Sequence, residues 1–156
     1  MRLCFTLKLL AAAALLSGNA AAQPAMPDPA HLQFRLPNDI QWRPASGGIA
    51  ETASLFGGAG QPGPYATAVH YFPGKFSEAH THNHDRHIYV VSGTWWVGTT
   101  DKVDPDKAMP IPAGSYVKHV AGKIHWDGAK NEDVRLVIFG IGQGAGSTTN
   151  QAGAGR

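Results

Sequence analysis

Short apolar segments separated by glycine and proline dominate this sequence and restrict it to a β-rich fold. The segments are rich in β-branched and aromatic residues, and none repeats its apolar residues with the 3.6-residue period of a helix. Turn residues separate them, at Pro73-Gly74, Ser92-Gly93, Pro112-Ala113-Gly114 and Asp127-Gly128. The predicted strands are Ala50–Phe56, Tyr65–Phe72, Ile88–Val97 (broken at Ser92-Gly93), Ser115–Val120 and Val134–Ile141. This pattern predicts an all-β sandwich or barrel.

The N-terminus has the pattern of a secretory signal peptide. Arg2 and Lys8 give it a basic start, Leu9–Leu16 is a short apolar run, and the small residues Ala20-Ala21-Ala22 supply a cleavage site. The apolar run is shorter than the ~20 residues that a membrane-spanning helix needs. We therefore expect residues 1–22 to be removed and the mature chain to be periplasmic or secreted.

Charge and cysteine content exclude several partner classes for the mature chain. Without Arg2 and Lys8, 11 basic residues face 11 acidic ones, so we expect no nucleic-acid partner and no membrane partner after cleavage. The single cysteine, Cys4, lies in the signal, and disulfides are excluded. Residues 23–38 are rich in Pro and Ala, and residues 142–156 in small polar residues and Gly. We predict a loose N-terminal segment (23–38), one domain (39–141) and a flexible tail (142–156).

Histidine is the residue that points to chemistry. Four of the eight histidines fall between positions 80 and 87. Residues two apart in a strand point to the same side, so His80 and His82 can place two imidazoles on one metal ion. A third ligand must come from a neighbouring strand. His125 is the best candidate, because it follows the tight-turn sequence Ala121-Gly122-Lys123-Ile124 and opens another apolar segment.

The spacing of these histidines from glycines resembles the two motifs of the cupin superfamily. The first motif is matched by Gly74, five residues, His80-Thr81-His82, three residues, Arg86, six residues and Gly93. The second is matched by Gly114, five residues, Val120-Ala121-Gly122, two residues and His125, with Asn131 displaced. The resemblance implies a single cupin-type β-barrel (jelly roll) that holds one divalent metal ion through His80, His82 and His125.

The chain departs from the family where the metal-binding glutamate is expected. Arg86 occupies that position, and a guanidinium has no lone pair to give a metal. If Arg86 points inward, it can hold an anionic substrate whose other end lies on the metal. If it points outward, the site has three histidines alone. A register one residue longer would place His87 at the metal instead. Arg86 and His87 are therefore the two further candidate catalytic residues.

Other histidines have simpler interpretations. We expect His84 to be exposed in a turn, His70 to be a hydrogen-bonded core residue, and His119 to lie either behind the metal ligands or on the surface. No Ser-His-Asp arrangement, phosphate-binding glycine loop or zinc-ribbon cysteine pattern is present.

A neutral three-histidine site leaves coordination positions open for water, substrate or oxygen. The resemblance implies an enzyme acting on a small anionic or chelating molecule, and we expect an Fe(II)-type dioxygenase or related oxidoreductase. Mn, Ni, Cu and Zn are admissible metals. A metal-dependent isomerase or decarboxylase, a non-catalytic ligand-binding or sensor cupin, and a purely structural metal site are alternatives, because a fold does not choose among functions. A homodimer is also open.

Overall fold

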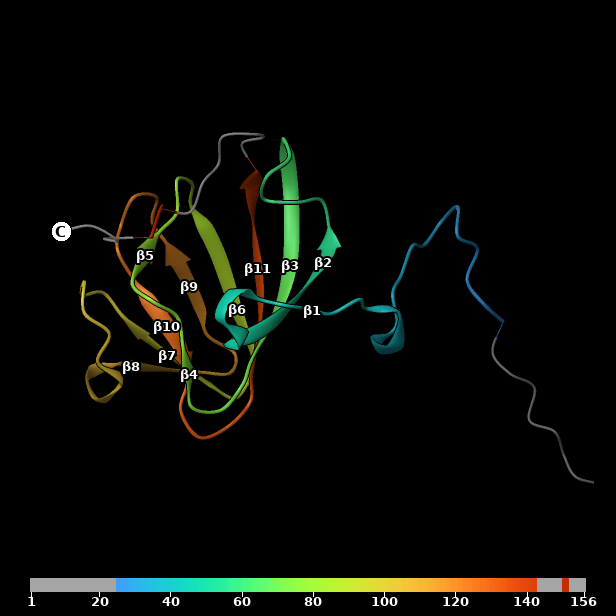
Figure 1. Ribbon diagram of the computed structural model, residues 1–156. Coiled ribbons are helices and arrows are strands. Elements are labelled where there is room, and N and C mark those ends of the chain that lie inside the picture. Colours follow the sequence, from blue (N-terminus) through green and yellow to red (C-terminus); the bar gives the residue numbers. More distant parts are fainter. Residues whose placement is uncertain (1–24, 143–149, 152–156) are drawn as a thin grey trace, which may run out of the picture. The chain divides into compact units, whose positions relative to one another are not determined.

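The computed structural model describes residues 25–142 and 150–151, and every strand belongs to the unit that begins at Arg35. Two antiparallel sheets form its framework (Figure 1). The larger sheet contains, in spatial order, β1 (Arg43–Pro44), β2 (Ala50–Phe56), β3 (Gly63–Tyr71), β11 (Val134–Gly142), β6 (Arg86–Ser92) and β9 (Tyr116–His119). The smaller contains β4 (Lys75–Phe76), β10 (Trp126–Ala129), β7 (Thr94–Gly98) and β8 (Met109–Pro112). A short separate pair joins β5 (His80–Thr81) to β12 (Asn150–Gln151).

The prediction of an all-β fold is confirmed. Helical geometry in the described residues is confined to three 3-10 turns, η1 (Pro37–Asp39), η2 (Ser46–Gly48) and η3 (Pro105–Lys107). The predicted strand Ala50–Phe56 has the bounds of β2, and β3, β9 and β11 differ from their predictions by one or two residues at an end. The predicted segment Ile88–Val97 forms β6 and β7, which turn at Gly93 with a φ of 76°.

The turn predicted at Asp127-Gly128 is wrong, because both residues lie inside β10. Gly128 does not form a turn; it allows two neighbouring strands to approach each other closely. A Cβ at this position would lie 2.1 Å from the carbonyl oxygen of Lys75 on the neighbouring strand β4. Glycine in a strand often marks such an approach. The correction matters for the site described below, because it makes Asp127 a strand residue with a defined facing.

The inner faces of the two sheets form one apolar core. Its buried residues come from the larger sheet and, through Trp95 and Ala129, from the smaller one. Ile88 and Val90 of β6 are completely buried at its centre. Side chains alternate along a strand, so Arg86 shares the inward face of β6 with these two residues.

A second apolar cluster fixes the start of β10. Trp126 is 1% exposed and packs with Ala79, Ala108 and Phe76. Its ring lies over Gly98 of β7, where a Cβ would be only 2.1 Å from a Trp126 ring atom. The indole N–H donates to the hydroxyl of Thr100 at 3.2 Å. Trp126 is therefore held both by packing and by a hydrogen bond.

The predicted terminal segments are mostly outside the described residues. The signal at 1–22 is wholly outside, and the tail is described only at Gly142, which ends β11, and at Asn150–Gln151. The backbone of Asn150–Gln151 pairs with that of His80–Thr81. None of the helices found in the described residues is long and apolar enough to cross a membrane.

His70 ties three chain segments of the larger sheet together. Its Nδ1 lies 2.9 Å from a carboxylate oxygen of Glu51 on β2, and its Nε2 lies 2.8 Å from one of Asp133, just before β11. The ring is 9% exposed and packs edge-on against Phe72 at 5.0 Å. His70 is thus a hydrogen-bonded residue of the framework, and its two bonds go to charged partners.

The substitution His70→Ala should lower the free energy of unfolding by about 2 kcal/mol, because it removes two hydrogen bonds to carboxylates and a packed ring. Urea unfolding of the variant and the parent measures this. His31→Ala, which removes an exposed histidine, is the matched control and should leave the midpoint unchanged. Equal midpoints for His70→Ala and the parent would contradict the assignment.

Candidate metal centre

Backbone hydrogen bonds bring the three predicted metal ligands together. The N–H of His80 donates to the carbonyl of His125 at 2.8 Å, and the N–H of His125 donates back to the carbonyl of His80 at 3.0 Å. The carbonyl of His82 accepts from the N–H of Gly122 at 2.7 Å. Two segments that lie 40 or more positions apart in the sequence are thereby held in one register. His80 and His125 face each other in this pairing, and His82 lies two residues beyond His80.

The three imidazole rings converge. The ring centroids of His80, His82 and His125 are 4.8 Å (His80–His82), 4.5 Å (His80–His125) and 5.0 Å (His82–His125) apart, a nearly equilateral triangle. One ligand atom from each residue lies within 4.8 Å of the others, so together they could hold a metal ion. This arrangement matches the ligand set expected from the spacing of the motifs.

Local hydrogen bonds set which nitrogen is free in two of the three rings, those of His80 and His125. Nδ1 of His80 lies 2.7 Å from the carbonyl of Glu78, and Nδ1 of His125 lies 3.1 Å from that of Lys123. Carbonyl oxygens only accept, so these Nδ1 atoms carry the proton and the Nε2 lone pairs are available. Nε2 of His125 and Nδ1 of His82 are buried with no hydrogen-bond partner in the described chain. Buried polar atoms of this kind fit a site built to bind an ion.

Burial keeps two of the ligands, His82 and His125, neutral. It is the main cause that lowers the pKa of His82 from 6.5 to about 2, and the nearby Arg86 guanidinium lowers it further. Burial also lowers the pKa of His125. A neutral imidazole is the form that coordinates a metal, so protons do not compete for these lone pairs near neutral pH.

Arg86 points into the interior, one of the two orientations left open by the sequence. Its guanidinium donates to the hydroxyl of Tyr65, and its Nε is buried without a partner in the described chain. Burial lowers the pKa of Arg86, while Tyr65, Asp127 and Tyr71 oppose that effect. A guanidinium remains protonated in proteins even so. The position of the family's glutamate therefore holds a buried positive charge.

Arg86 lines an inner cavity of about 230 Å³ together with Tyr65, Tyr71 and apolar residues of β2, β3 and β11. A second, more open cavity of about 670 Å³ is lined by His80 and His82. Tyr71 lines both cavities. The metal ligands and Arg86 thus border neighbouring spaces.

Two residues near the histidines were not identified as site residues from the sequence. Asp127 is 4% exposed and accepts a hydrogen bond from the hydroxyl of Tyr71. His119 lies against His125, with ring centroids 3.7 Å apart, and burial lowers its pKa to about 4. The His-x-Asp spacing of His125 and Asp127, the same spacing as His80 and His82, is the signal that could have identified the carboxylate.

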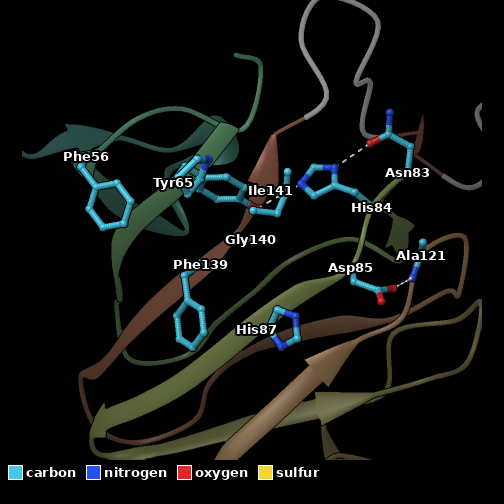
Figure 2. A pocket seen from close by; sticks show the side chains of 11 residues that line it. Phe56, Tyr65, Asn83, His84, Asp85, His87, Ala121, Phe139, Gly140 and Ile141 are labelled. Carbon is cyan, nitrogen blue, oxygen red and sulfur yellow. Dashed lines mark hydrogen bonds between the residues drawn. The ribbon is translucent and has the colours of Figure 1, made fainter. Parts of the chain in front are cut away.

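His87 lies on the other face of β6, away from the three ligands. Its ring stacks between Phe139 and Tyr116, and its Nδ1 lies 2.7 Å from the Tyr116 hydroxyl. Figure 2 shows His87 and Phe139 among the side chains that line an outer pocket. This pocket has a volume of about 850 Å³, and His80, His82 and His125 are not among the described residues that line it. The structure therefore separates His87 from the metal ligands.

His84 is buried, contrary to the expected exposed turn. It is 7% exposed, and its Nε2 lies 3.1 Å from the Tyr65 hydroxyl. Figure 2 shows His84 and Tyr65 at one side of the outer pocket. Because Tyr65 also bonds Arg86, His84 is connected to the interior through a single side chain.

The fold is that of known cupins, although no family model and no curated protein matches the sequence. The polyketide cyclase RemF from Streptomyces resistomycificus is 14% identical with a TM-score of 0.63, covering 80% of this chain and 87% of its own. KdgF from Halomonas sp. is 17% identical with a TM-score of 0.58, covering 71% and 95%. A cupin-2 domain from Rhodospirillum rubrum is 13% identical with a TM-score of 0.61, covering 79% and 81%. The predicted cupin resemblance is confirmed at the level of the fold.

The depressed pKa values make the metal-free protein sensitive to acid. In the folded protein His82 has a pKa of about 2 and His119 a pKa of about 4, whereas both have a pKa near 6.5 in the unfolded chain. Below pH 6.5 the unfolded chain therefore binds more protons than the folded one, and acidification favours unfolding. Stability should be constant above pH 7 and fall from pH 6.5 to 5, by at most about 1.4 kcal/mol per pH unit for each proton. Thermal melting of the metal-free protein measures this. His82→Gln should flatten the slope, and equal stability of the parent at pH 7 and 5 would contradict the assignment.

Proposed function

We propose that this chain is a metal-dependent enzyme acting on a small anionic or chelating molecule, and that Fe(II) serves it in a dioxygenase-type oxidation. The observation that carries the proposal is the pairing of three converging histidines with an inward-facing arginine. The histidines offer lone pairs for a divalent ion, and Arg86 offers a fixed positive charge. A small substrate can therefore be held at two points.

His80, His82 and His125 are the residues that would hold the ion. Three protein ligands leave coordination positions for substrate, as catalytic rather than closed structural sites do. When bound, the ion supplies Lewis-acid and redox chemistry. The open cavity beside His80 and His82 gives a small molecule access to this position.

Arg86 would bind the anionic group of the substrate. Its charge sits in an inner cavity whose other polar lining includes the hydroxyls of Tyr65 and Tyr71. A guanidinium can grip a carboxylate with two parallel hydrogen bonds, and low polarity around the pair strengthens them. A molecule with a metal-binding end and a carboxylate therefore fits these two neighbouring cavities.

The comparisons support enzymatic use of the fold without specifying the reaction. RemF is described as a polyketide cyclase. An enzyme that works on small molecules thus shares this architecture, although its identity to this chain is low. Export of the mature chain, predicted from residues 1–22, is part of the proposal and concerns residues outside those described.

Removing any one of the three histidines should lower the Fe(II) content sharply. His80→Ala, His82→Ala and His125→Ala should each weaken affinity by orders of magnitude, and the metal-dependent rise in melting temperature should shrink with it. Elemental analysis and melting with and without Fe(II) measure these effects. His87→Ala, on the outer face, is the control. Unchanged occupancy in all three variants would refute the ligand assignment.

Arg86 should matter for substrate rather than for metal. After anaerobic loading with Fe(II), small diketones, phenols and carboxylates should be screened for oxygen uptake. For a carboxylate substrate, Arg86→Gln should raise KM at least about tenfold through loss of a charge-assisted pair, with metal content unchanged. Arg86→Lys should recover part of the loss, and Arg43→Gln, at an exposed position, should have no effect. Ligands bound and returned intact across the panel would indicate a non-catalytic binding protein instead.

A further inference from the structure

A second group of potential metal ligands shares His125 with the first. One ligand atom each from His119, His125 and Asp127 lies within 4.8 Å of the others. Neither His119 nor Asp127 belongs to the histidine spacing from which the first group was predicted. Asp127 follows His125 by two residues, so both side chains point to the same side of the chain.

His119 is placed by strand pairing. It is the direct partner of Arg86 across β9 and β6, and residues directly opposite in an antiparallel pair share one face of the sheet. Its Nε2 is buried and has no hydrogen-bond partner in the described chain. The residue opposite Arg86, which occupies the position of the family's glutamate, therefore offers a ring nitrogen that has no hydrogen-bond partner among the described residues and could bind a metal ion.

Asp127 is held in place by its backbone. Its N–H donates to the hydroxyl of Ser77 at 3.0 Å, and its carbonyl accepts from the N–H of Ser77 at 2.8 Å. Its carboxylate accepts from the Tyr71 hydroxyl. A carboxylate has about four lone-pair positions, so one such bond leaves capacity for a cation. This is a buried carboxylate within reach of two imidazoles.

We propose that His119, His125 and Asp127 form a second seat for the divalent ion, overlapping the seat of His80, His82 and His125. The proposal rests on the metal-binding part of the proposed function. Nδ1 of His125 is committed to the carbonyl of Lys123, so His125 has one lone pair, at Nε2, and serves one ion at a time. The chain therefore has alternative seats for a single ion.

The two seats differ in the ions that they favour. Three neutral imidazoles suit Zn(II) and Cu(II), whereas a carboxylate increases the preference for harder ions such as Mn(II). The second seat also supplies one negative charge that the first lacks. The identity of the ion thus decides which seat is occupied, and Mn(II) and Zn(II) are the probes that separate the two.

The test measures the affinity of Zn(II) and Mn(II) for the metal-free full chain by calorimetric titration. Asp127→Asn should weaken Mn(II) binding at least about tenfold and Zn(II) binding less than about threefold, and His80→Ala should do the reverse, because each removes a ligand from one seat alone. His125→Ala should weaken both ions. Asp106→Asn, an exposed carboxylate, is the control and should change neither.

The parent should bind one ion of either kind per chain, and Asp127→Asn should alter the Mn(II) electron paramagnetic resonance spectrum. Circular dichroism melting checks that each variant folds. If Asp127→Asn does not fold, His119→Gln takes its place with the same expected pattern. Equal losses for both ions in each variant would overturn the second seat and leave the first intact. Two ions per chain would overturn the sharing of His125, and absence of binding by the parent would overturn the proposed function as well.

Discussion

The reciprocal pair of backbone hydrogen bonds between His80 and His125 is the contact on which the site depends. It is an isolated bridge outside the two main sheets, and it joins a two-residue strand to the residue that precedes β10. Side-chain placement follows from it, because the direction of a side chain is set once its strand is paired. His82 is fastened separately, through Gly122, which turns with a φ of 72°. Three ligands are thus positioned by main-chain geometry.

Charge distribution in the interior gives the site its character. Burial keeps the metal ligands His82 and His125 neutral, and the arginine retains its charge because a guanidinium is a very weak acid. The hydroxyl of Tyr71 donates to Asp127, and burial together with that carboxylate raises the pKa of Tyr71 well above its usual value. One positive and one negative side chain therefore face the same interior, and each has its own tyrosine partner: Tyr65 for Arg86 and Tyr71 for Asp127.

Residue spacing in the sequence predicted the fold and the three ligands, but it did not predict which side chains face the interior. The alternation of His80 and His82 and the motif glycines predicted the fold and the three converging histidines, because Gly74, Gly93, Gly114 and Gly122 all adopt positive φ at turns. The facing of Arg86 and His87 could not be predicted, since a shift of one residue in register exchanges the two. His84 was expected to be exposed because it was placed in a turn, yet Tyr65 from a distant strand covers it. Asp127 was misread because a glycine after an aspartate suggests a turn, and only the neighbouring strand shows why that glycine is needed.

Gly98 has no side chain, yet it provides the space for a residue that lies between two candidate metal ligands. Its missing side chain makes room for the ring of Trp126, and Trp126 lies in the chain between His125 and Asp127. A Cβ at position 98 would lie 2.1 Å from an atom of that indole, so any larger residue there forces the ring or the strand to shift. Such a shift would occur in the residue that joins His125 to Asp127. Mutational tolerance in this protein is therefore set in part by a strand glycine, at a position that a survey of polar residues alone would overlook.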